Sequence, residues 1–285
     1  MEWYVLALLS ALVVSVIPII RKRVLVHEHA SEFTTTIYLT MVILFIPLLP
    51  YLDFGMTSTT FFLLLVKGVF LTVASLLFIK AARHMEISAV EPLRNLSVVF
   101  VMILSFIFLG EIITLQQGIG LILLISGAYT LEVHKHTITY SIPNRKFLYF
   151  ILFNLLLVSI MAIMDKVLVQ RTDVYTIVII PALVMAVLMF LYQSLKYKGF
   201  EDVLHAMKVG KGKMILLPIL TVIADALYIM ALAVPGALVA LVVALRRTST
   251  LISTIWGGEI FHDHFLMQKV IASLVMLMGI YIILF

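Results

Sequence analysis

Ionisable side chains lie inside segments of the chain that are otherwise apolar. Asp225 lies near the middle of one such segment, with Tyr228 three residues later on the same helical face. Arg246 and Arg247 lie near the middle of the next segment. An ionised group costs about 2.5–3.5 kcal/mol near the centre of a membrane helix, so such groups usually face a cavity or one another. Arginine binds carboxylates and phosphates through charge-assisted hydrogen bonds, so these residues indicate a site for an anionic group.

The turn between these two segments predicts that Asp225 pairs with one of the arginines. Asp225 lies 10 residues before Pro235 of the Pro235-Gly236 turn, and Arg246 lies 11 residues after Pro235. Both side chains are therefore expected at a similar depth. One aspartate cannot neutralise two adjacent arginines, which favours a binding site with Asp225 as a proton-exchanging or competing anion. The alternative is a buried pair that only fixes helix packing.

A second charged patch lies in the first half of the chain. Glu91 and Arg94 are three residues apart, so they can pair on one helical face. Either they only pair with each other near the membrane interface, or Arg94 belongs to the binding site and Glu91 to the coupling site. Lys67 is expected to be structural, with its long side chain reaching toward the interface. Glu111 is expected at a helix end.

The composition requires an apolar environment for most of the chain. Of its 285 residues 63% are hydrophobic and 12% are charged, whereas a soluble domain is about half apolar and a quarter charged. A helix satisfies its own backbone in a bilayer, and about 20 residues cross the hydrocarbon layer. The sequence therefore predicts an all-α integral membrane protein. Its ten transmembrane helices are expected near residues 3–20, 33–52, 60–82, 88–110, 113–133, 147–165, 174–194, 213–232, 236–258 and 265–285.

Polar residues recur between the two halves of the chain at fixed displacements. A displacement of 152 residues aligns P-L-R-N-L-S with A-L-R-R-T-S and continues without gaps. The polar and glycine pairs at this displacement are Arg94/Arg246, Ser97/Ser249, Glu111/Asp263, Gln116/Gln268, Gly127/Gly279 and Tyr129/Tyr281. A displacement of 144 residues pairs Ser15 with Ser159 and Lys22 with Lys166. Chance explains matched Leu and Val, but not this series.

The recurrence predicts a duplicated chain. We expect one five-helix repeat over residues 1–133, a linker loop over 134–146 and a second five-helix repeat over 147–285. Because five is an odd number, the second repeat must be inverted relative to the first. Inverted repeats are typical of secondary transporters, whose solute site lies between the halves near mid-membrane.

Basic residues gather in alternate loops. Most Lys and Arg residues outside the spans fall in loops 1, 3, 5 and 7, and the other side has only Lys166 and Arg171. The positive-inside rule places these four loops in the cytoplasm and both termini outside, with the plasma membrane as the expected location. Contact with anionic lipid accounts for the net charge of +5 without nucleic acid.

Motifs typical of enzymes and bound cofactors are missing from the sequence. The chain has no cysteine, no phosphate-binding glycine loop, no H-E-x-x-H and no G-x-S-x-G. Six histidines form three pairs, at 27/29, 134/136 and 262/264, but such spacing in a loop fixes no metal-ligand geometry. We therefore expect no enzymatic activity, no cofactor and no metal site.

The order of these motifs resembles the EamA group of the drug/metabolite transporter superfamily. V-E-P-L-R-N-L-S, F-L-G-E at 108–111 and Gly127 carry the resemblance in the first half. The second half retains Tyr228, A-L-R-R-T-S and Gly279, but has Ala244 in place of the helix-4 proline. The resemblance implies export or exchange of metabolites such as amino acids, nucleotide-type compounds or sugar phosphates.

The sequence thus predicts a secondary transporter for a small polar or anionic metabolite. Arg246, Arg247, Tyr228 and Arg94 are the expected substrate-binding residues, and Asp225 and Glu91 the expected coupling residues. The alternative is a non-transporting membrane scaffold or receptor whose basic loops bind a partner or anionic lipid. The solute and the lipid bilayer are the expected partners, and both monomer and homodimer remain open.

Overall fold

The computed structural model describes residues 2–25, 30–84, 96–133, 145–249, 252 and 266–284. In these ranges every regular element is helical, which confirms the all-α class. The elements are α1 Trp3–Leu25, α2 Ala30–Phe45, the 3₁₀ helix η1 Ile46–Tyr51, α3 Ser58–His84, α5 Ser97–Leu109, α6 Leu115–Val133, α7 Arg145–Leu168, α8 Val174–Lys196, α9 Phe200–Gly210, α10 Lys213–Ala233, α11 Val239–Arg246 and α13 Leu266–Leu284.

Six of the described helical segments are long and apolar enough to cross a membrane. They are Trp3–Arg21, Ser31–Tyr51, Ser58–Ala81, Tyr149–Leu168, Val174–Lys196 and Lys213–Ala233. Shorter apolar helices lie at Ser97–Leu109, Leu115–Gly127 and Leu274–Ile283. The prediction of an integral membrane protein is confirmed by this pattern, because helices of this length and composition would expose large apolar surfaces to water.

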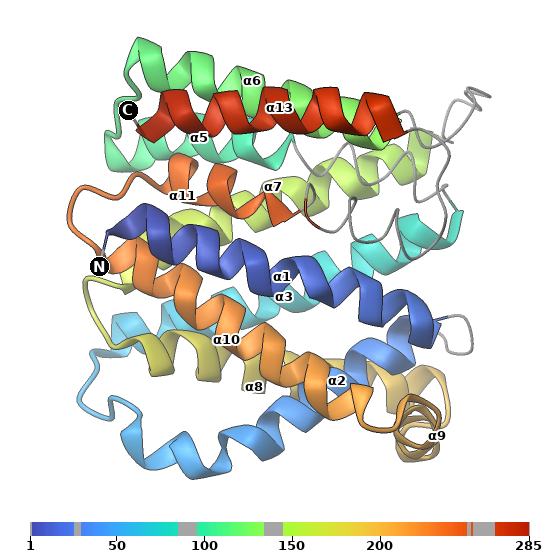
Figure 1. Ribbon diagram of the computed structural model, residues 1–285. Helices are drawn as coiled ribbons and strands as arrows, with labels where there is room; N and C mark the ends of the chain where they lie inside the picture. The colour runs from blue at the N-terminus through green and yellow to red at the C-terminus, as the bar shows by residue number, and fades with distance from the viewer. Residues whose placement is uncertain are drawn as a thin grey trace.

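The long helices run side by side, and both chain ends lie at one edge of the bundle, which we call the terminal side (Figure 1). The connections 169–173 and 234–238 lie at the same edge. Helix α9 lies at the opposite edge, between the end of α8 and the start of α10.

Helices from the first and second halves of the chain pack against each other in pairs. Helix α1 packs on α10, and α3 packs on α7. In the first pair, the Ser10 hydroxyl donates a 2.7 Å hydrogen bond to the carbonyl of Ala224. In the second, the Asn154 amide donates a 2.7 Å hydrogen bond to the carbonyl of Ala74. Both polar side chains are buried, so these bonds satisfy them without water.

Helices α6 and α13 approach each other closely and run in opposite directions (Figure 1). A methyl group on Gly279 would lie 2.7 Å from the carbonyl oxygen of Gly120. A methyl group on Gly127 would lie 2.9 Å from the carbonyl oxygen of Ala272. Glycine is therefore required at these contacts, as is common where membrane helices pack through small residues.

Several predicted boundaries differ from the observed ones. The predicted helix 33–52 changes to the 3₁₀ helix η1 after Phe45, because Pro47 and Pro50 lack backbone N–H groups. The segment 195–212, predicted as a loop, contains helix α9. The predicted helix 236–258 begins at Val239 and turns at residues 247–248, and part of the predicted helix 88–110 lies outside the described residues.

We predict that Gly279→Ala destabilises the protein. The added methyl group would clash with the backbone of Gly120, and overpacking of this kind costs about 1–3 kcal/mol. The midpoint of thermal unfolding in detergent should fall. Gly118→Ala is the matched control, since nothing lies within 4 Å of a methyl group there. Equal midpoints for the two variants would contradict the close α6–α13 contact.

Candidate functional site

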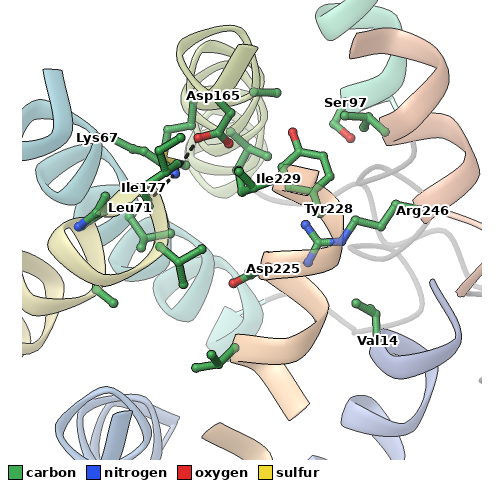
Figure 2. Close-up of a pocket in the computed structure, with 18 of the residues that line it drawn as sticks. Val14, Lys67, Leu71, Ser97, Asp165, Ile177, Asp225, Tyr228, Ile229 and Arg246 are labelled. Atoms are coloured by element: carbon green, nitrogen blue, oxygen red, sulfur yellow. Dashed lines mark hydrogen bonds and ion pairs between the residues drawn. The ribbon is translucent and has the colours of Figure 1, made fainter. Parts of the chain in front are cut away.

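A cavity of about 330 Å³ lies inside the bundle. Residues of eight described helices line it, from α1, α2, α3, α5, α7, α8, α10 and α11, and Figure 2 shows the central part of this lining. Most lining side chains are apolar. The ionisable and hydroxyl-bearing ones are Lys67, Asp165, Asp225, Arg246, Arg247, Tyr38, Tyr228, Ser97 and Ser249.

The predicted pair of Asp225 with an arginine is confirmed, and its partner is Arg246. The Arg246 Nη2 atom lies 2.5 Å from Asp225 Oδ1. The Arg246 guanidinium also lies over the ring of Tyr228, 4.7 Å from the ring centroid, a favourable cation–π geometry. The Arg246 and Asp225 side chains are 26% and 40% exposed, so this pair remains open to the cavity.

Arg247 lies on the cavity wall next to α5. Its Nη2 atom donates a 2.7 Å hydrogen bond to the Ser97 hydroxyl. Ser97 is the first residue of α5, and Arg247 follows the last residue of α11, so this bond joins the two helix ends. The positive charge at the C-terminal end of α11 is favoured by the helix dipole. The two adjacent arginines therefore have different partners.

A second ion pair, which the sequence did not predict, joins α3 and α7. The Lys67 Nζ atom lies 2.5 Å from Asp165 Oδ1, and these side chains are only 12% and 7% exposed. Lys67 also donates a 3.3 Å hydrogen bond to the carbonyl of Ile177 at the start of α8. The expectation that Lys67 reaches toward the interface is therefore wrong. Figure 2 shows Lys67 and Asp165 across the cavity from Arg246.

Asp165 was missed because it was placed at the end of the predicted helix 147–165. Helix α7 continues to Leu168, which places Asp165 one turn inside the helix end. The available signal was a lysine and an aspartate in apolar segments of opposite halves of the chain, because each is costly to bury unless the two side chains meet.

Hydrogen bonds at the terminal side join the 52–57 loop to the 169–173 connection and to the start of α8. The Thr172 hydroxyl donates to Asp53 Oδ2 at 3.0 Å, and the Asp53 backbone N–H donates to the Thr176 hydroxyl at 2.9 Å. Asp173 caps the start of α8 by accepting a 2.9 Å hydrogen bond from the Thr176 backbone N–H. Asp53 thus attaches the 52–57 loop to a preorganised helix start.

The turn between α10 and α11 is held by two charged side chains. Glu111 accepts the backbone N–H of Val239 at the start of α11, at 2.9 Å. Lys166 donates 2.8 Å hydrogen bonds to the carbonyls of Leu232 and Ala237. Burial raises the pKa of the Glu111 carboxyl, and the Val239 hydrogen bond and the charge of Lys166 act in the opposite direction. These hydrogen bonds fix the position of the N-terminal end of α11, the helix that contains Arg246.

Two predicted site residues, Glu91 and Arg94, lie outside the described residues. The six paired histidines, at 27, 29, 134, 136, 262 and 264, also lie outside them. Within the described residues, no group of three or more His, Asp or Glu side chains could hold a metal ion. The described lining of the cavity carries charged side chains and hydroxyl groups.

Residues 1–132 match the EamA-like transporter family, which confirms the predicted resemblance over the first half of the chain. The match over residues 1–132 and the apolar helices support a membrane transporter of the general drug/metabolite type. No curated protein matches the chain.

Solved structures support the same fold over the whole chain. One crystal structure, described only as that of a protein, superposes with a TM-score of 0.77 at 12% sequence identity. The match covers 99% of this chain and 96% of the other. This likeness concerns the fold alone.

We predict that Lys67→Met destabilises the protein more than the double change Lys67→Met with Asp165→Leu. The single variant leaves a buried carboxylate without its partner, which costs about 3–5 kcal/mol, whereas replacing both charges by apolar groups is often neutral. Thermal unfolding of the purified variants measures the difference. A double variant as unstable as the single one would contradict the direct pairing.

Proposed function

We propose that this protein is a secondary carrier that moves a small polar or anionic metabolite by alternating access. The observation that carries the proposal is the open ion pair of Asp225 and Arg246 in a cavity between the two halves. A pair that only fixes helix packing can be buried, as the Lys67–Asp165 pair is, whereas a binding site must leave its charged groups reachable by a solute.

The proposed architecture is a ten-helix bundle of two inverted repeats, residues 1–133 and 147–285, joined by the linker 134–146. Reciprocal contacts support it. The α1–α10 and α3–α7 hydrogen bonds have donors Ser10 and Asn154, which are 144 residues apart, and acceptors Ala74 and Ala224, which are 150 apart. Exchanging the halves therefore turns one bond into the other.

The α6–α13 contact supports the same symmetry. Gly120 and Ala272 are 152 residues apart, and so are Gly127 and Gly279. Gly120 contacts Gly279, and Gly127 contacts Ala272, so each contact maps onto the other when the halves are exchanged. Two antiparallel helices related in this way are expected from a two-fold axis in the membrane plane. The family match also ends at residue 132, next to the predicted end of the first repeat.

In the proposed cycle the anionic group of the solute competes with Asp225 for Arg246. The face of Tyr228 and the guanidinium of Arg247 form the rest of the wall, and Arg94 and Glu91 contribute from the first half. Asp225 is the proposed coupling residue, because once displaced from Arg246 it can take up a proton or a cation. The hydroxyl of Tyr38, from α2, lines the same cavity.

Alternating access requires the closed terminal side to open. The contacts of Asp53 with Thr172 and Thr176 are neutral or singly charged hydrogen bonds, each worth roughly 0.5–3 kcal/mol. They are strong enough to favour this closed state and weak enough for solute binding to reverse it. The basic loops at the opposite side support a cytoplasmic location for that side, and the plasma membrane is the proposed location.

The test is a search for a solute with the purified carrier, followed by flux. A panel of small carboxylates, phosphates and zwitterions is screened for ligands that raise the unfolding temperature. Each ligand found is then tested for uptake or exchange in proteoliposomes. Arg246→Gln should weaken binding about 10- to 100-fold, as expected for loss of a charge-assisted hydrogen bond.

Arg171→Gln is the matched control for charge, because Arg171 is exposed in the 169–173 connection and outside the cavity lining. Binding by Arg171→Gln should equal that of the wild type. A ligand that both variants bind as tightly as the wild type does would contradict the role of Arg246. Absence of flux for the whole panel would count against a carrier.

We predict that Asp225→Asn separates binding from coupling. The neutral amide cannot exchange a proton but keeps the shape of the site, so solute exchange should persist while a pH gradient no longer drives accumulation. Proteoliposomes with and without an imposed pH gradient measure both activities. Gradient-driven accumulation at the wild-type level would exclude Asp225 as the coupling residue.

A further inference from the structure

Helix α9 presents three different faces. Val203 and Ala206 are buried on the face that packs against α2. Phe200, Leu204 and Met207 are exposed, and their spacing of four and three residues places them on one stripe beside the buried face. The remaining face carries Glu201, Asp202, His205 and Lys208 together with the exposed Val209. A helix with an apolar stripe normally buries that stripe against an apolar surface. The stripe of Phe200, Leu204 and Met207 is exposed, so we expect an apolar environment outside the protein to contact it.

The position of α9 indicates what covers this stripe. The helix lies across the ends of the membrane-crossing helices α8 and α10 rather than along them (Figure 1). The last turn of α8 exposes Leu195 to 89%, and the first turn of α10 exposes Ile215 to 48%. The apolar stripe of α9 thus lies between two exposed apolar positions of the adjoining spans.

Basic side chains surround the same helix. Lys208, Lys211 and Lys213 are exposed, and none of them makes an ion pair within the described residues. The nearby acidic side chains are already engaged. Glu201 lies 3.9 Å from Lys198, and Asp202 accepts hydrogen bonds from the Gln193 amide and the Lys198 backbone N–H.

Aromatic rings mark the same level of the bundle. Lys196 lies 5.5 Å from the ring centroid of Tyr192 and 5.8 Å from that of Tyr197. Tyrosine and lysine are the residues that membrane proteins place at the headgroup level, where an apolar body and a polar tip are both satisfied. An apolar stripe, a basic rim and interfacial aromatics therefore coincide at α9.

We propose that α9 is an interfacial helix that inserts Phe200, Leu204 and Met207 below the headgroups and binds the phosphates of anionic phospholipids through Lys208, Lys211 and Lys213. An amphipathic helix with a basic polar face binds membranes through burial of its apolar side chains and through electrostatic attraction to anionic lipids. This inference is independent of the transport activity, because it uses no residue of the cavity.

The depth of α9 can be measured directly because the chain contains no cysteine. Single-cysteine variants Leu204→Cys, Met207→Cys and Glu201→Cys are labelled with a nitroxide in liposomes of phosphatidylcholine and phosphatidylglycerol. Labels at 204 and 207 should be relaxed mainly by oxygen, which concentrates in lipid. The label at Glu201, on the polar face, should be relaxed mainly by a water-soluble nickel chelate. Equal nickel access at all three positions, or no access at 204 and 207 for either reagent, would overturn the insertion.

The lipid preference needs a second measurement. The triple variant Lys208→Gln, Lys211→Gln and Lys213→Gln is compared with wild type in nanodiscs of phosphatidylcholine alone and of an equimolar mixture with phosphatidylglycerol. The wild type should unfold at a higher temperature in the anionic lipid, and the triple variant should lose most of this rise.

Two controls separate charge from fold. The triple Lys→Arg variant should retain the rise because it keeps the charges, and Arg171→Gln, at the opposite surface, should also retain it. A triple Gln variant that keeps the full rise would overturn the assignment of these lysines to anionic lipid.

Discussion

An ion inside an apolar bundle must be paired, and this constraint organises the centre of the molecule. Lys67 and Asp165 meet this need in a nearly dry contact that joins α3 of the first half to α7 of the second. Asp225 and Arg246 also pair with each other, but their side chains line the cavity and remain partly exposed. Since breaking a buried pair costs several kcal/mol, the first pair is suited to hold the halves together. The more exposed second pair can exchange its partner for a solute at a lower cost.

Neutral contacts and charged contacts have different roles in this molecule. The contacts that map onto each other in the proposed repeat are hydrogen bonds to backbone carbonyls and close glycine contacts. The Asp225–Arg246 pair departs from this symmetry, because Arg94 aligns with Arg246 but the displacement of 150 residues places the uncharged Ser75 opposite Asp225. A symmetric frame would allow the same rocking motion toward both sides, whereas an asymmetric charge set would concentrate solute recognition in the second half. Glu111 connects the two, since it belongs to the first half and holds the start of α11.

The sequence predicted what depends on composition and spacing. Apolar length was sufficient for the all-α membrane class, and the similar distances of Asp225 and Arg246 from Pro235, 10 and 11 residues, were sufficient to predict their pairing. The Lys67–Asp165 pair was not predicted, because α3 and α7 become neighbours only through the packing of the two halves. Pro47 and Pro50 indicate the 3₁₀ helix η1 in the sequence, but the segment is apolar throughout, so hydropathy alone did not separate it from α2. Helix α9 was missed because it is short and carries Glu201, Asp202, His205 and Lys208, which make it too polar to appear as a span.

The central claim is that the charged cavity is reached by solvent from one side at a time. Ser249 lines the cavity in a chain without cysteine, so Ser249→Cys provides a single reactive position. Oriented membrane vesicles are treated with a small charged thiol reagent from either face, with and without a transported solute. Alternating access predicts that the cysteine reacts from the side opposite the termini, that solute protects it at rest, and that it reacts from the terminal side only during exchange. A cysteine that reacts from neither side under any of these conditions would show a dry core and contradict the account.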